Sequence, residues 1–185
     1  DAQGCTKSSV STVTGQTTPF TASNTKTDIS CFGLSNGSAN VTQAGGQSPY
    51  SYLWSDGSTT QNRTGLAAGS YVVTVTDAAG CTATSGLTIS QPALLSVLLQ
   101  ATQPTCPPGV SPPFNADGSV TLTISGGTPA YTYLWNNGAT TQNRTNLAAG
   151  TYSVTVTDSK GCQVIKSVTL TPTSTLPNAP TVINR

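Results

Sequence analysis

Five cysteines carry most of the chemistry that this sequence could perform: Cys5, Cys31, Cys81, Cys106 and Cys162. A zinc site built from four cysteines needs short pairs such as C-x2-C, and the sequence has none, so disulfides are favoured over a metal site or free thiols. One cysteine opens and another closes each of two similar segments, which predicts the bonds Cys31–Cys81 and Cys106–Cys162. Cys5 would pair with a cysteine before residue 1. Such bonds indicate an oxidising compartment outside the cytosol.

Acid–base and nucleophilic catalysis have few candidate residues in this chain. It contains no His, no Glu and no Met, and its six acidic residues are all Asp. A Ser-His-Asp or Cys-His nucleophile system is therefore excluded, and acid–base work would be left to Asp, Lys, Tyr or Cys. We predict that the chain is not an enzyme, and that it has no catalytic residue, no cofactor and no metal site.

The composition also restricts the class of partner. Charged residues make up 7% of the chain, against roughly 25% in ordinary soluble domains, and the net charge is +1. A field this weak does not attract nucleic-acid phosphates, so we predict no nucleic-acid partner. No apolar stretch reaches the ~20 residues that cross a bilayer, and we expect no direct membrane insertion.

The segments that position the cysteines occur more than once. Residues 50–81 and 131–162 align without a gap and are identical at 23 of 32 positions. DAQGC at 1–5 resembles DAAGC at 77–81 and DSKGC at 158–162, so the chain is expected to open on the end of a further repeat. The predicted organisation is the C-terminal strand of a preceding repeat at 1–14, repeats at 15–91 and 92–173, and a linker or the start of another module at 174–185.

Alternating apolar residues predict β-strands. In GSYVVTVTD the side chains of Tyr71, Val73 and Val75 share one face, and GTYSVTVTD repeats the pattern. About seven short strands per repeat, separated by turn signals, predict an all-β fold of tandem immunoglobulin-like β-sandwiches with one disulfide in each. Trp54 and its counterpart Trp135 are expected between the sheets, and the Tyr of the late strand is expected to form a corner.

The ordered string of motifs resembles the SprB repeat, which occurs in very large cell-surface adhesins of Bacteroidota. The first repeat carries NGSANV, PYSYLWSDG, LAAGSYVVTVTDAAGC and LTISQP, and the second keeps this order with a Pro-rich insertion after Cys106. The match covers nearly the whole chain, although Ala130 stands where the pattern usually has Pro. The resemblance implies a repeat-built surface protein, exported by the type IX system, associated with gliding motility or attachment, and without catalytic residues.

Four polar residues form the candidate ligand surface: Arg63, Arg144, Asn62 and Asn143. They belong to TQNRT, which is identical in both repeats and too polar for a core. The arginines could pair with an Asp of their own repeat or mark a repeated ligand stripe, and pairing is favoured.

Two further pairs leave alternatives open. Trp54 and Trp135 could stack on sugar rings, but burial between the sheets is favoured. Asp77 and Asp158 each precede a Gly-Cys turn and could bind calcium between repeats. Calcium takes about six to eight oxygen ligands, so capping of the turn by backbone N–H groups is favoured instead.

We therefore predict a structural repeat segment of a long extracellular adhesin, acting as a stalk or filament in surface attachment or gliding motility. It would sit at the cell surface, attached to the outer membrane. Its partners would be neighbouring repeats of the same chain, with surface glycans or other cell-surface proteins as further candidates. The alternatives are a carbohydrate-binding module and an accessory stalk of a secreted polysaccharide-degrading enzyme.

Overall fold

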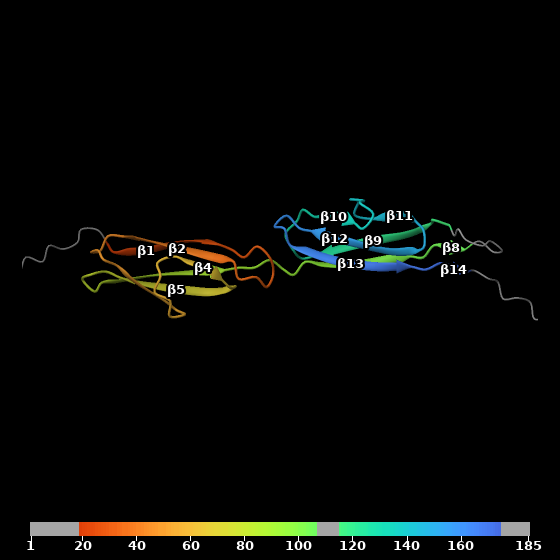
Figure 1. Cartoon of the computed structure of the whole chain (residues 1–185). Helices are drawn as coiled ribbons and strands as arrows, with labels where there is room; N and C mark the ends of the chain where they lie inside the picture. Colours follow the sequence, from red (N-terminus) through yellow and green to blue (C-terminus); the bar gives the residue numbers. More distant parts are fainter. Residues whose placement is uncertain (1–18, 107–114, 175–185) are drawn as a thin grey trace, which may run out of the picture. The chain divides into compact units, whose positions relative to one another are not determined.

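The computed structural model describes residues 19–106 and 115–174, which form two compact units (Figure 1). The regular elements of these residues are all β-strands, so the predicted all-β fold is confirmed. The segments predicted at 1–14 and beyond Ser174 lie outside the described residues.

The two units are not two continuous stretches of the sequence. Unit 1 holds residues 19–27 and 37–89. The intervening segment Asp28–Asn36 belongs to unit 2, together with the residues from Ser90 onward. A loop that leaves one repeat therefore completes the other unit.

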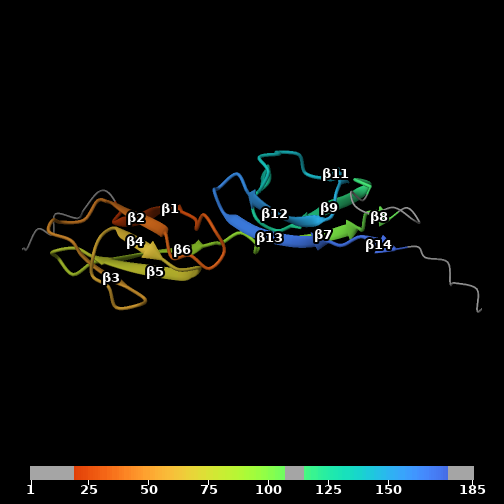
Figure 2. The same cartoon turned by 45° about the vertical axis from the view of Figure 1, so that its right-hand side comes forward.

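Unit 1 is a sandwich of two three-stranded antiparallel sheets. One sheet has the strand order β1-β2-β4 and the other has the order β3-β5-β6. Figure 2 shows the two layers, with β1, β2 and β4 above β3, β5 and β6. The strands are β1 (Thr21–Thr27), β2 (Gly37–Ala44), β3 (Ser51–Trp54), β4 (Arg63–Leu66), β5 (Gly69–Thr76) and β6 (Thr82–Ile89).

Unit 2 repeats this topology strand for strand. Its sheets have the orders β7-β9-β11 and β10-β12-β13, and a short parallel pair, β8 and β14, is added to them. The strands are β7 (Ser96–Thr102), β8 (Thr105–Cys106), β9 (Gly118–Ser125), β10 (Thr132–Trp135), β11 (Arg144–Leu147), β12 (Gly150–Thr157), β13 (Gln163–Leu170) and β14 (Thr173–Ser174).

Each sandwich has six strands, one fewer than the seven or so expected. The polar residues 55–62 between β3 and β4 form turns and bends rather than a strand. Their polar side chains bond to backbone instead, as described below.

The alternation of side chains explains which face of each strand is buried. In β5, Val73 and Val75 point into the sandwich and are fully buried, while Val72, the residue before them, is about half exposed. Trp54 pairs in register with Val73 and is only 2% exposed, and Trp135 is 1% exposed, so the predicted placement of both indoles between the sheets is confirmed. The equivalent core of unit 2 consists of Val97, Val120, Leu122, Trp135, Leu147, Val154, Val156 and Leu170.

The predicted tyrosine corner is present in both units. Tyr71 Oη donates a hydrogen bond to the Ala67 carbonyl at 3.1 Å, and Tyr152 Oη donates to the Ala148 carbonyl at 3.0 Å. Each bond reaches back four residues and fixes the chain where it enters β5 or β12, as in immunoglobulin-like sandwiches.

Candidate functional site

The disulfide of the structure joins Cys31 to Cys162, across 131 residues of sequence. Both cysteines belong to unit 2, because Cys31 lies in the Asp28–Asn36 segment. Their Cα atoms are 5.7 Å apart, within the range of ordinary disulfides. The predicted pairs Cys31–Cys81 and Cys106–Cys162 are therefore wrong, and Cys81 has a free, exposed thiol.

The strand layout of unit 1 explains why Cys31 and Cys81, the two cysteines of the first repeat, do not pair with each other. The loop that carries Cys31 follows Thr27, at the end of the sheet where β1 stops. Cys81 follows β5 at the opposite end, where the Ala78 N–H bonds to the Gln47 carbonyl. A strand of eight residues separates these two ends by about 26 Å. A disulfide holds its Cα atoms within roughly 7 Å, so each cysteine must find a partner outside its own sandwich.

The same argument excludes the predicted pair in unit 2. Cys106 follows β7, whose last residue Thr102 pairs with Ser119 at one end of the sheet. Cys162 lies in the turn after β12, at the other end, where the Ser159 N–H bonds to the Thr128 carbonyl. Cys5, the remaining cysteine, lies outside the described residues.

Hydrogen bonds hold the Asp28–Asn36 segment in unit 2. The Ile29 N–H donates to the Ser90 carbonyl at 3.0 Å, and the Ser90 N–H donates to Asp28 Oδ1 at 2.8 Å. The Gly33 N–H donates to Gln91 Oε1 at 2.9 Å. Ile29 is buried as well, so the segment is fixed by backbone contacts and by an apolar anchor in addition to the disulfide.

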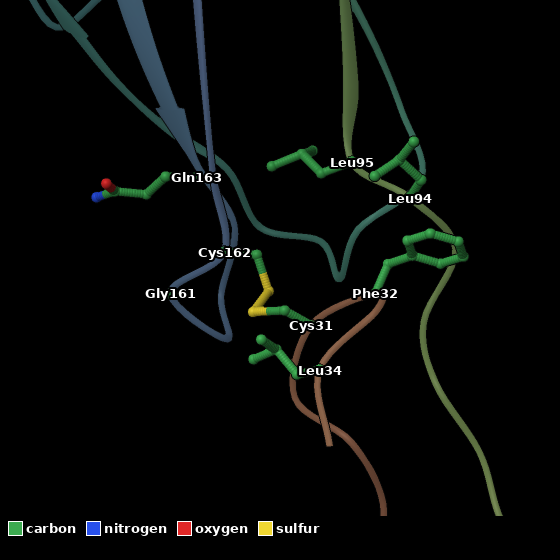
Figure 3. A pocket seen from close by; sticks show the side chains of 8 residues that line it. All are labelled: Cys31, Phe32, Leu34, Leu94, Leu95, Gly161, Cys162 and Gln163. Carbon is green, nitrogen blue, oxygen red and sulfur yellow. A yellow bond between two sulfur atoms is a disulfide. The ribbon is translucent and has the colours of Figure 1, made fainter. Parts of the chain in front are cut away.

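Apolar side chains surround the disulfide. A hollow of about 280 Å³ lies beside it. Figure 3 shows the side chains that line this hollow, with Phe32 and Leu34 on the Cys31 segment and Leu94 and Leu95 opposite. Phe32, Leu34 and Leu94 are each 47–61% exposed, whereas Leu95 is buried. The disulfide therefore lies at the edge of a hollow that apolar side chains line from both sides.

A tight turn presents Cys162 to its partner. Asp158 organises the turn, because its carboxylate accepts three backbone hydrogen bonds. Burial of the carboxyl opposes ionisation, but these hydrogen bonds outweigh it and bring the pKa of Asp158 below its usual value. The donors are the N–H groups of Thr128 at 2.8 Å, Lys160 at 2.9 Å and Cys162 at 2.9 Å.

The turn that carries Cys81 in unit 1 has the same geometry. Burial again opposes ionisation of Asp77, and backbone hydrogen bonds again hold its pKa below the usual value. The donors are the N–H groups of Gln47 at 3.0 Å, Ala79 at 2.9 Å and Cys81 at 2.8 Å. The predicted role of Asp77 and Asp158 as caps of the turn is confirmed.

The amides of the candidate ligand surface bond to the backbone of their own unit. Asn62 Oδ1 accepts the Val41 N–H at 3.2 Å, and Gln61 Nε2 donates to the Val41 carbonyl at 2.8 Å. Asn143 and Gln142 bond to Leu122 in the same way, at 3.0 Å each. These amides satisfy the backbone of β2 and β9 where β4 and β11 pair irregularly with them.

Arg63 is held by an acid and a ring. Its guanidinium donates to both carboxylate oxygens of Asp56, at 2.9 and 2.8 Å. The same guanidinium lies 5.5 Å from the centroid of the Trp54 ring. The bond to Arg63 is the largest contribution that lowers the pKa of Asp56. Pairing of this arginine with an Asp of its own repeat, the favoured interpretation, is what the structure shows.

Arg144 occupies the equivalent place in unit 2 with a neutral partner. It lies 5.6 Å from the centroid of Trp135 and donates to Asn137 Oδ1 at 2.9 Å. Asn137 replaces the acid found at Asp56, so the position of the guanidinium is kept although the ion pair is lost. The contact with the indole and the amide is therefore enough to orient the side chain.

The described part of the chain lacks two kinds of feature, a cluster of metal ligands and a membrane-spanning helix. No group of three or more His, Cys, Asp or Glu residues there could hold a metal ion. Among the same residues, no helix has the length and apolar character needed to cross a membrane. Because both indoles are buried, neither offers a face on which a sugar ring could stack.

The strand order and the turns define the class of protein to which this chain belongs. It consists of tandem β-sandwich repeats, each with the same cysteine-bearing turn. Two segments, residues 23–59 and 114–140, match the family model of the SprB repeat, one in each repeat of the chain. Each repeat thus contains a segment similar to the SprB repeat, and the resemblance inferred from the sequence is confirmed at these two segments.

Other comparisons add little. No curated protein matches the chain. Among solved structures, the amphioxus IgVJ-C2 molecule is 16% identical, with 82% of this chain and 96% of that chain covered and a TM-score of 0.32. The two-sheet arrangement described above rests on the strand pairings themselves.

Proposed function

We propose that this chain is a structural repeat segment of a long extracellular adhesin, acting as a stalk or filament in surface attachment or gliding motility. In this role the two units serve as spacers, and the adhesive contact is made elsewhere in the polypeptide. The parent protein would be exported by the type IX system of a Bacteroidota cell and attached to its outer membrane.

The SprB repeats are the observation that carries this proposal, because they support a structural repeat of a cell-surface protein. The contacts made by the polar residues of TQNRT also support the proposal. The phrase TQNRT, which occurs in both repeats, uses its Gln and Asn amides to satisfy backbone groups and its Arg to contact an indole. Residues that fit a ligand surface by type are thus engaged in holding the fold.

Labelling of intact cells tests the surface location. Fab fragments raised against the purified chain are expected to label living cells of the source organism without permeabilisation, and to reduce attachment or gliding speed. Fab fragments against a cytoplasmic protein are the control. Labelling that appears only after permeabilisation would contradict the proposal.

A competition experiment separates a stalk from an adhesive module. The purified chain, added in excess to cells, is expected to leave attachment unchanged, because a spacer has no receptor to occupy. A glycan array with the same chain distinguishes the carbohydrate-binding alternative, with Arg63→Ala and Arg144→Ala as matched variants. Competition, or a glycan signal that both substitutions remove, would favour a binding module instead.

A further inference from the structure

The free thiol of Cys81 lies in a turn that has an equivalent in unit 2. The cysteine of that equivalent turn, Cys162, forms a disulfide. In both turns the aspartate N–H bonds to the cysteine carbonyl at 3.0 Å. In both, the cysteine N–H returns a bond to the aspartate Oδ1, at 2.8 Å for Cys81 and 2.9 Å for Cys162. The glycine before each cysteine has the same positive φ, 84° at Gly80 and 83° at Gly161. The backbone therefore presents the two sulfur atoms in the same way.

The apolar neighbour of the turn is duplicated as well. At Gly127, an added Cβ would lie 3.0 Å from Leu95 and 2.9 Å from the carboxylate of Asp158. At Gly46, the equivalent glycine of unit 1, an added Cβ would lie 2.8 Å from the Phe20 ring and 3.1 Å from the Asp77 carboxylate. Phe20 thus takes the place of Leu95, with a larger apolar surface.

In unit 2 the apolar surface at Leu95 faces the Asp28–Asn36 segment. The Asp28–Asn36 segment brings Cys31 to Cys162, and its Phe32 and Leu34 line the same hollow as Leu95 (Figure 3). That segment is the loop that follows the first strand of a repeat and carries its opening cysteine. Within the described residues, no such loop is bonded to Cys81.

We propose that Cys81 is the attachment site for the opening-cysteine loop of the repeat that precedes it in the polypeptide, and that the loop's apolar residues pack against Phe20. By analogy with Cys31 and Cys162, which are 131 residues apart, the partner cysteine lies about as far before Cys81, ahead of residue 1. The inference rests on the tandem-repeat part of the proposed function and is independent of any adhesive role.

The bond requires an oxidant, since two thiols lose two protons and two electrons when they join. A disulfide-bearing oxidoreductase or a low-molecular-weight disulfide of the extracytoplasmic compartment would accept them and be reduced to two thiols. In the exchange step the thiolate of one cysteine attacks a mixed disulfide on the other, and the carrier leaves as its thiolate.

An exchange assay tests the recognition. The full chain with Cys5→Ser and Cys106→Ser retains Cys81 as its free thiol when the Cys31–Cys162 bond is intact. The probe is a peptide with the sequence of residues 28–36, DISCFGLSN, whose cysteine carries a thionitrobenzoate leaving group. Attack by Cys81 joins peptide to protein and releases the coloured thiolate. We expect this release to be at least about tenfold faster than with a Phe32→Ala, Leu34→Ala peptide or with the glutathione adduct, because apolar burial favours docking.

A chain that also carries Cys81→Ser is the control, and it should release no colour above background. Equal rates for the three probes would overturn the inference, because the thiol would then react without recognition.

Disulfide mapping of the native, full-length protein tests the partner. The peptide that contains Cys81 is expected to be recovered bonded to a cysteine of the preceding repeat in the same polypeptide. Its recovery as a free thiol, bonded to Cys5, or bonded to a second copy of the chain would overturn the inference. None of these results depends on surface labelling or attachment, so the two proposals fail separately.

Discussion

The turns after β5 and β12 have the same backbone geometry, but their cysteines differ in chemical state. In unit 2 the cysteine of the turn, Cys162, is bonded to Cys31, whereas the cysteine of unit 1, Cys81, is free. A second difference separates the same two repeats, since Arg63 pairs with an acid and Arg144 with an amide. The backbone has kept its form in both places while the partner changed.

This comparison indicates that the aspartate and the glycine of the turn set its geometry, and that the disulfide does not. The carboxylate of Asp77 makes the same three backbone bonds beside a free thiol as Asp158 makes beside a bonded one. A preformed turn holds the sulfur at the surface before any partner arrives. Bonding then requires no refolding of the repeat.

The largest expected effect on stability comes from removing the Cys31–Cys162 disulfide, which has no equivalent at Cys81 in unit 1. Cys31→Ser should remove about 5 kcal/mol of stability in the chain-entropy model for a 131-residue separation. That corresponds to a fall of roughly 20–40 °C in the melting temperature of unit 2, because a domain of this size shifts by about 4–8 °C per kcal/mol. Calorimetry measures it, and Cys81→Ser is the matched control that should leave both transitions in place. An unchanged unit 2 transition would contradict the assignment.

Replacement of the buried indoles should affect the two units equally. Trp54→Ala and Trp135→Ala are each expected to cost about 3–5 kcal/mol, because each leaves a large cavity between the sheets. Denaturant unfolding of each variant gives the loss. Leu53→Ala and Leu134→Ala, at exposed positions next to the indoles, should stay within about 0.5 kcal/mol of the parent. A clear inequality between the tryptophans would break the equivalence of the repeats.

Acid should weaken the two turns in parallel. The folded-state pKa values of Asp77 and Asp158 lie below their ordinary value, so the stabilisation they provide is present above the unfolded pKa. It is lost as the pH falls through the folded pKa, so the melting temperature should be steady from pH 7 to about 5 and decline below about 4.

The matched variants are Asp77→Asn and Asp158→Asn. Each should lower the melting temperature of its own unit at pH 7 and make the acid decline of that unit shallower. Asp56 and Asp117 also have lowered pKa values and leave part of the decline in place. A decline of unchanged steepness would show that the turn carboxylates do not contribute to it.

The smallest effect is expected from exchange of the arginine partners. Asp56→Asn should make unit 1 resemble unit 2, and Asn137→Asp should give Arg144 the carboxylate that Arg63 has. Exposed ion pairs contribute little and are screened by salt, so shifts of a few degrees at most are expected, larger at low salt. Melting temperatures at low and high salt measure them. Salt-independent shifts would indicate that packing on the indole, rather than charge, is responsible.

Local pattern was enough to predict the sheets, the core and the turns. Alternation placed Val73 and Val75 inside, and the position of Trp54 at the end of a strand placed it between the sheets. The capping role of Asp77 followed from its place before a Gly-Cys turn. Each of these features is decided by residues that are close in sequence or paired in one sheet.

The disulfide could not be predicted from equal spacing of cysteines, because it depends on where the strands end. Cys31 and Cys81 look like a pair when each repeat is treated as a closed module. The strand pairings show instead that they leave the sandwich at opposite ends, because Cys31 follows the end of β1 and Cys81 follows the end of β5. The assignment of Asp28–Asn36 to unit 2 depends on contacts with Ser90 and Gln91, far away in sequence. No periodicity indicates such contacts.

The Cys31–Cys162 bond also determines how a pulling force would travel through the polypeptide. Tension follows covalent bonds, so it would leave β1, cross the two sulfur atoms and continue into β13. The 131-residue stretch between the cysteines would bear none of it. Fully extended, that stretch would measure about 430–470 Å, a reserve of length that the intact bond keeps out of the path of the force. The redox state of one bond would thus set how far this segment can lengthen.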